Sequence, residues 1–113
     1  MDINSDPGPP PHLVAKWKAQ WSTVDQAIKS LDPQSPNFSS AARGTWEQLG
    51  ELFDVVREGQ PPSPNPFGVL CKEYHDLGTV IETDPGKRTY VVDELIHLRD
   101  GVLTHWETLY PLR

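Results

Sequence analysis

The chain has 113 residues, of which 16 are acidic and 10 are basic, so its formal net charge is −6. A chain of this length forms one domain, with or without tails. The negative charge makes nucleic acid an unlikely partner and suits a basic protein, because nucleic acids and anionic lipids are bound through lysine and arginine. The one cysteine, Cys71, excludes an internal disulfide framework and fits a reducing compartment.

Residues 1–11 are polar and rich in proline. Consecutive prolines favour an extended conformation without internal hydrogen bonds, so we expect an N-terminal arm before a single helical domain at residues 12–113. The arm has neither the basic segment nor the apolar segment of a signal peptide. No apolar run approaches the ~20 residues of a membrane span. We therefore expect a cytoplasmic protein with no membrane insertion.

Apolar residues at steps of three and four predict a first helix over residues 13–31. Asp32 and Pro33 end it, because the residue before a proline is pushed out of the α region. Trp17 and Trp21, one turn apart, make the stripe strongly apolar, and a lone helix cannot bury it. The stripe consists of Val14, Trp17, Trp21, Val24, Ile28 and Leu31.

Residues 40–58 are predicted to form a second helix, after a connection that contains two prolines. Either Ser39 or Ser40 can cap its first turn, and Gly59 suits the left-handed position after its last turn. The apolar residues repeat at steps of four and three, as expected for one buried face. They are Ala42, Trp46, Leu49, Phe53 and Val56, with Leu52 beside them.

A third helix is predicted to begin at Pro66, because proline suits the first helical position and Asn65 can cap it. Gly78 lies within its apolar face and costs about 1 kcal/mol of helix propensity relative to alanine. We therefore expect another backbone to approach closely at Gly78. The face consists of Phe67, Leu70, Tyr74, Leu77 and Ile81, with Cys71 and Gly78 on the same side.

A fourth helix is predicted over residues 89–110, with Thr89 as its cap and Pro111 as its stop. Four amphipathic helices without a convincing strand predict an all-α fold, an antiparallel four-helix bundle with a proline-rich N-terminal arm. The central stripe of the fourth helix is Val91, Leu95, Leu98, Val102, Trp106 and Leu109, with Val92, Ile96 and Leu103 extending it.

Arg99 and His105 bracket the sequence R-D-G-V-L-T-H in the fourth predicted helix. This motif resembles that of the HEPN ribonucleases, which are small all-α proteins, although Glu107 stands where that family often has tyrosine. The resemblance implies metal-independent RNA cleavage at a dimer interface, with Arg99 stabilising phosphate charge and His105 handling protons. A structural interpretation stays open, because Arg99 falls within the predicted apolar arc and a buried arginine needs an acidic partner. The candidates for that partner are Asp76, Glu47 and Glu51.

No metal or cofactor site is predicted. Glu94 and His97 have the E-x-x-H spacing of di-iron bundles, but such sites need a second E-x-x-H, which this sequence lacks. Cys71 and His75 share a helix face, as a nucleophile and its base would, without any other signature of a cysteine enzyme. We interpret the first pair as part of a solvated face and the second as a buried thiol beside an imidazole.

The sequence favours an interaction protein: a small acidic accessory subunit, adaptor or inhibitor that binds a larger, basic protein. No complete catalytic set accompanies the aromatic side chains, which exceed what one small bundle needs. We expect Trp17 and Trp21 to contribute to the partner surface, together with Glu47, Glu51 and Asp54. A homodimer stays open as well.

The acidic residues of the second and fourth helices are expected mostly to face outward, because each lies off its apolar stripe. A further alternative, a small helical subunit of a nucleoprotein complex, requires the lysines of the first helix to form a basic patch. These lysines are Lys16, Lys18 and Lys29. The acidic residues are Glu47, Glu51, Asp54, Asp93, Glu94, Asp100 and Glu107.

Overall fold

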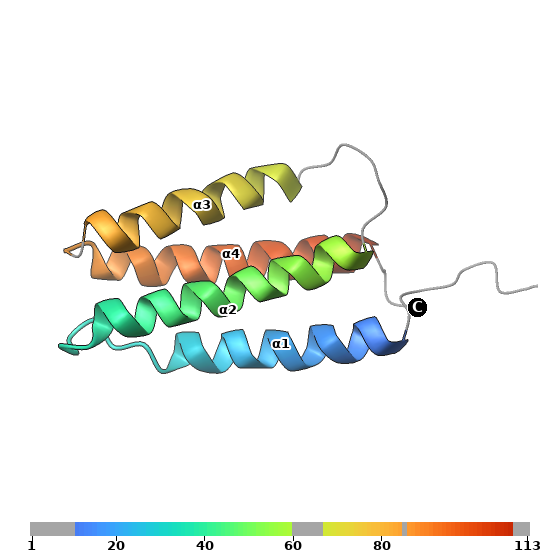
Figure 1. Ribbon diagram of the computed structural model, residues 1–113, viewed down its shortest axis with the longest axis horizontal. Coiled ribbons are helices and arrows are strands. Elements are labelled where there is room, and N and C mark those ends of the chain that lie inside the picture. The colour runs from blue at the N-terminus through green and yellow to red at the C-terminus, as the bar shows by residue number, and fades with distance from the viewer. Residues whose placement is uncertain (1–10, 60–66, 85, 110–113) are drawn as a thin grey trace, which may run out of the picture.

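The structure, a computed structural model, describes residues 11–59, 67–84 and 86–109. These residues form four helices and contain no strand, which confirms the predicted all-α class. Figure 1 shows the helices lying alongside one another, with successive helices running in opposite directions. None of the described helices is long and apolar enough to cross a membrane. The helices are α1 (Pro11–Lys29), α2 (Phe38–Gly59), α3 (Phe67–Thr83) and α4 (Arg88–Leu109).

The first helix begins earlier than the sequence predicted. The helix begins at Pro11, two residues before the predicted start at Leu13, so Pro11 belongs to the helix. Proline fits the first helical position because its fixed φ is already helical and its missing N–H would have no intrahelical partner there. The predicted arm otherwise lies outside the described residues, as do the Asn65 cap and Pro66 of the third helix.

The predicted N-caps of α2 and α4 were wrong. The first helical hydrogen bond of α2 runs from Ala41 N to Asn37 O at 3.0 Å, so Asn37 precedes the first turn and both Ser39 and Ser40 lie within it. In α4 the bond from Val91 N to Lys87 O, also 3.0 Å, places Lys87 at the cap instead of Thr89. Asn37 is as favourable a cap as serine, so propensity could not choose between them, whereas at α4 the preceding connection places Lys87 at the cap against propensity.

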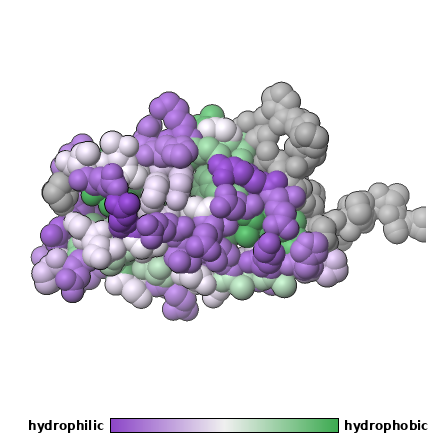
Figure 2. Space-filling model, in the orientation of Figure 1, coloured by the Kyte–Doolittle hydropathy of each residue, from purple (hydrophilic) through white to green (hydrophobic). Residues whose placement is uncertain are grey.

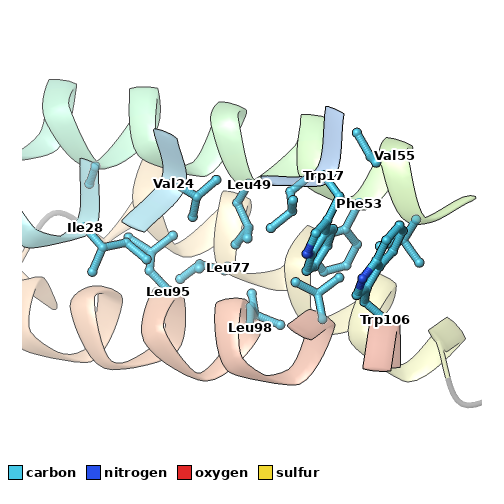
Figure 3. Packing of buried hydrophobic residues seen from close by; sticks show 14 of the residues in the cluster. Trp17, Val24, Ile28, Leu49, Phe53, Val55, Leu77, Leu95, Leu98 and Trp106 are labelled. Carbon is cyan, nitrogen blue, oxygen red and sulfur yellow. The ribbon is translucent and has the colours of Figure 1, made fainter. Parts of the chain in front are cut away.

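All four helices contribute to one hydrophobic core. Trp17 of α1, Leu49 of α2, Leu77 of α3 and Leu98 of α4 converge there (Figure 3). Most of the predicted stripes are confirmed, with shifts at their edges. Leu13 and Val55 are buried although the predicted stripes omit them, whereas Val14, Trp21, Leu31, Trp46, Leu70, Cys71 and Tyr74 are only partly buried.

A reciprocal contact joins α2 to α3. The rings of Trp46 and Tyr74 stack with centroids 4.5 Å apart. The Trp46 Nε1–H donates to the Tyr74 carbonyl at 2.8 Å, and the Tyr74 hydroxyl donates to the Trp46 carbonyl at 2.9 Å. The Trp46 ring fills the space that a side chain would need at Gly78 of α3. The Tyr74 ring fills the corresponding space at Gly50 of α2.

The glycine prediction therefore needs a correction. A Cβ at Gly78 would lie 2.5 Å from Cζ2 of the Trp46 indole, so a close approach exists at this position. The approaching group is a side chain and not the backbone that we expected. Gly101 of α4 plays a similar role towards α3, because a Cβ there would lie 2.8 Å from a methyl carbon of Leu70.

Candidate partner-binding surfaces

Four carboxylates form a stripe along the exposed side of α2, which we call the acidic ridge: Glu47, Glu51, Asp54 and Glu58. Their spacing of four, three and four residues places them on one face of the helix. The prediction that the acidic residues of α2 and α4 face outward is confirmed, since six of the seven are exposed and Glu94 is half-buried. Sequence reasoning had not included Glu58, although the same spacing would have identified it.

Basic side chains of the same molecule contact three of the four carboxylates. Arg43 Nε lies 3.6 Å from Glu47, Arg57 Nη1 lies 2.7 Å from Asp54, and Lys16 Nζ lies 2.8 Å from Glu58. The hydrogen bond from Lys16 lowers the pKa of Glu58. Exposed ion pairs of this kind contribute little to stability, because water solvates both charges when they separate. Partner cations can therefore replace the internal ones.

Glu51 differs from its neighbours, because no ion pair reaches it within the described residues. It also lies between two open hollows. One, of ≈ 400 Å³, lies between α1 and α2 and includes Ala19 and Val55 among its walls. The other, of ≈ 290 Å³, lies between α2 and α3 and includes Phe53 and Tyr74. Glu51 and Asp54 line both hollows, so carboxylates border two concavities with partly apolar walls.

The two tryptophans predicted for the partner surface lie on the other flank of α1, towards α4. Trp17 is buried and stacks on Trp106, with ring centroids 4.5 Å apart and planes 3° from parallel. Trp21 is half-buried. Both line a hollow of ≈ 230 Å³ with Lys18 and Leu103, which we call the tryptophan groove. The structure thus separates the predicted tryptophans from the predicted carboxylates, and sequence reasoning missed Leu103 as a lining residue.

Arg99 forms the predicted ion pair, but with a different partner. Its Nη1 donates to Asp25 Oδ1 of α1 at 3.0 Å, and its Nη2 lies 2.9 Å from the neighbouring Asp100. The guanidinium carbon also lies 5.9 Å from the centroid of the Trp21 ring. The side chains of Arg99 and Asp25 are 18% and 15% exposed, so the pair is largely shielded. The predicted partners, Asp76, Glu47 and Glu51, were wrong.

His105 is directed elsewhere. It is buried and stacks on Phe67 of α3, with ring centroids 4.9 Å apart. Burial lowers the pKa of His105 and so favours the neutral imidazole. Arg99 contacts α1 while His105 contacts α3, and these contacts do not favour a common site for an RNA phosphate.

The remaining candidate groups have structural contacts. His97 Nε2 lies 3.3 Å from Glu73 of α3, and the described residues contain no cluster of three or more metal-ligating side chains. Arg57 Nη2 donates to the sulfur of Cys71 at 3.3 Å, whereas His75 is exposed.

The lysines of α1 form no common patch. Lys16 pairs with Glu58 of α2, Lys29 pairs with Asp25, and Lys18 lines the tryptophan groove. The geometry therefore does not favour the nucleoprotein alternative, which depended on such a patch.

Comparisons of the chain with protein-family models, with curated proteins and with solved structures find no match.

Proposed function

We propose that this chain is an antiparallel four-helix bundle that acts as a cytoplasmic protein-interaction module: an accessory subunit, adaptor or inhibitor of a basic protein partner. The observation that carries the proposal is the acidic ridge between its two hollows. Three of the four carboxylates lie beside basic side chains of the same chain, so the local excess of negative charge is at Glu51, which has no internal counterion in the described residues.

Charge and shape have different roles in this proposal. The ridge accelerates encounter with a positively charged surface, because opposite charges steer diffusing molecules towards each other. Lasting affinity comes from apolar side chains of the partner that enter the hollows against Ala19 and Tyr74, which retain exposed surface there. On the face that Figure 2 shows, the surface is mainly hydrophilic with smaller apolar areas, as expected for a polar interface that holds a few apolar contacts.

The test is a kinetic comparison with a partner captured by the immobilised chain. The double variant Glu47→Lys and Glu51→Lys should slow association and leave dissociation nearly unchanged, and the wild-type association rate should fall as salt rises. The control is Asp93→Lys with Glu107→Lys, which makes the same change in net charge at exposed positions of α4. Circular dichroism should show that both variants keep the fold.

Surface plasmon resonance across a salt series distinguishes the outcomes. An association rate that does not depend on salt, or full affinity in the α2 variant, would contradict a role for the ridge in recognition. Equal losses in both double variants would show that only overall charge matters and that the ridge is not the docking site.

A further inference from the structure

The tryptophan groove is an apolar surface near the start of α1. Trp17, Trp21 and Leu103 supply its apolar walls, and Lys18 supplies its one cation. Val14, half-buried and one turn before Lys18, continues the apolar track towards Pro11. Six and ten residues separate Pro11 from Trp17 and Trp21, which is about 9 and 15 Å along a helix. Whatever precedes Pro11 is therefore tethered within a short reach of the groove.

We propose that the occupant of this groove is the N-terminal segment of the same chain, residues 1–6, folded back along α1. The proline-glycine-proline sequence at residues 7–9 is a turn signal, which allows the chain to reverse its direction just before α1. Six extended residues span about 20 Å, enough to pass Trp17 and reach Trp21. This inference concerns the other flank of α1 and does not depend on the acidic ridge.

The sequence of the segment matches the groove in pattern and in charge. Successive side chains of an extended chain point to opposite sides, so Met1 and Ile3 share one side while Asp2 and Asp6 share the other. The apolar side covers Trp17, Trp21 and Leu103. The carboxylates lie along the edge where Lys18 has no ion pair within the described residues.

Trp21 adds an independent reason to expect an occupant. Its Nε1–H is buried and has no hydrogen-bond acceptor within the described residues. A buried donor without an acceptor costs about 1–3 kcal/mol. Because this nitrogen has no exposed surface, the Trp21 ring must turn towards the groove before a carbonyl of the extended segment, which has no backbone partner of its own, can accept its hydrogen.

The first experiment compares the full chain with a chain that lacks residues 2–10, by recording the indole N–H signals in nitrogen-15 NMR spectra. Deletion should shift the Trp21 and Trp17 signals. It should leave the Trp46 signal in place, because the Trp46 indole N–H is hydrogen-bonded to the Tyr74 carbonyl between α2 and α3. The Trp21→Phe variant lacks one indole N–H signal, and this missing signal is thereby assigned to Trp21. Unchanged Trp21 and Trp17 signals after deletion would overturn the proposal.

The second experiment places a spin label at residue 3 through Ile3→Cys, in a Cys71→Ser background. The label should broaden the Trp21 indole signal and spare that of Trp46. Lys18→Glu should reduce the broadening, whereas Lys72→Glu, the same charge change at an exposed position of α3, should not. If the broadening persists undiminished in Lys18→Glu, the proposed pairing of Lys18 with the carboxylates of the segment is wrong.

A mixed sample distinguishes docking of the chain's own N-terminal segment from docking of a second copy of the chain. Spin-labelled chains without nitrogen-15 are added to nitrogen-15 chains without the label. Broadening in the mixture, together with a dimer mass in light scattering, would overturn the proposal in favour of a homodimer through the groove. Broadening confined to the chain that carries its own label supports intramolecular docking.

Discussion

Two glycines of α2 have opposite surroundings. A Cβ at Gly44 would meet no heavy atom within 4 Å, whereas a Cβ at Gly50 would overlap the Tyr74 hydroxyl. Glycine inside a helix costs about 0.5–1 kcal/mol relative to alanine. Gly44→Ala should therefore raise the free energy of unfolding by about that amount, and Gly50→Ala should lower it by displacing Tyr74. Urea denaturation measures both, and a stabilising Gly50→Ala would contradict the tight α2–α3 packing.

Tyr74 should make the protein sensitive to alkali. Burial, reinforced by the charges of Asp54 and Glu47, raises the pKa of Tyr74 from 10.0 to about 12. Between these two pH values the unfolded chain loses this proton while the folded chain keeps it, so stability falls as pH rises. Below pH 10 this group contributes no pH dependence. Denaturation curves recorded from pH 9 to 12 should show the decline in the wild type.

The control for this prediction is Tyr74→Phe. It should reduce the slope of stability against pH within the same window, although it also removes the hydrogen bond to the Trp46 carbonyl. An alkaline slope identical to that of the wild type would assign the sensitivity to other groups.

At the scale of whole elements, the Arg99–Asp25 pair links α4 to α1. Both side chains are largely shielded, and without the Asp25 charge the Arg99 guanidinium keeps only the exposed Asp100 as an acidic partner. Asp25→Asn should therefore lower the free energy of unfolding by about 1–3 kcal/mol, as expected for a hydrogen bond to a charged group.

Asp76→Asn is the matched comparison for that prediction, because it breaks an exposed pair with Lys72 on α3. It should cost less than about 1 kcal/mol. Thermal denaturation at low and high salt measures both, and equal losses in the two variants would contradict the importance of shielding at Asp25.

Periodicity predicted which faces of the helices are buried, but not what covers them. The spacing of apolar residues is local information, and it identified the centre of each stripe, as at Val24 and Leu49. The side on which a neighbouring helix packs depends on positions far apart in sequence, which is why Leu13 is buried and Trp21 only partly so. Arg99 illustrates the same limit: its need for an acid could be predicted, but Asp25 lies 74 residues away.

In the candidate site too, local spacing predicted which side chains face outward but not which of them lie together. That Glu47, Glu51 and Asp54 face outward could be read from their positions off the stripe. Their separation from Trp17 and Trp21 could not, because it depends on α2 and α4 packing on different flanks of α1. Leu103 was assigned only to the edge of a stripe, and its place in the groove requires the position of α4 relative to α1.

At the scale of the whole molecule, the described core is one cluster and should unfold as one unit. Leu49 on α2 and Leu98 on α4 are both 0% exposed. Either Leu49→Ala or Leu98→Ala should therefore cost about 2–5 kcal/mol. Guanidinium denaturation followed by circular dichroism and by tryptophan fluorescence should give coincident transitions in both variants. Losses below about half a kcal/mol would mean that the core had been assigned to the wrong faces.

The stack of Trp17 on Trp106 joins the first helix to the last at the end of the molecule where α1 begins and α4 ends (Figure 1). A mechanical load applied at Pro11 and Leu109 would act first on this end of the molecule, where Leu13 and then Trp17 anchor α1. The two helices would then separate turn by turn from that end, instead of sliding past each other along their whole length. In optical tweezers the protein should yield at low force, and Trp17→Ala should lower the force at which the first extension occurs.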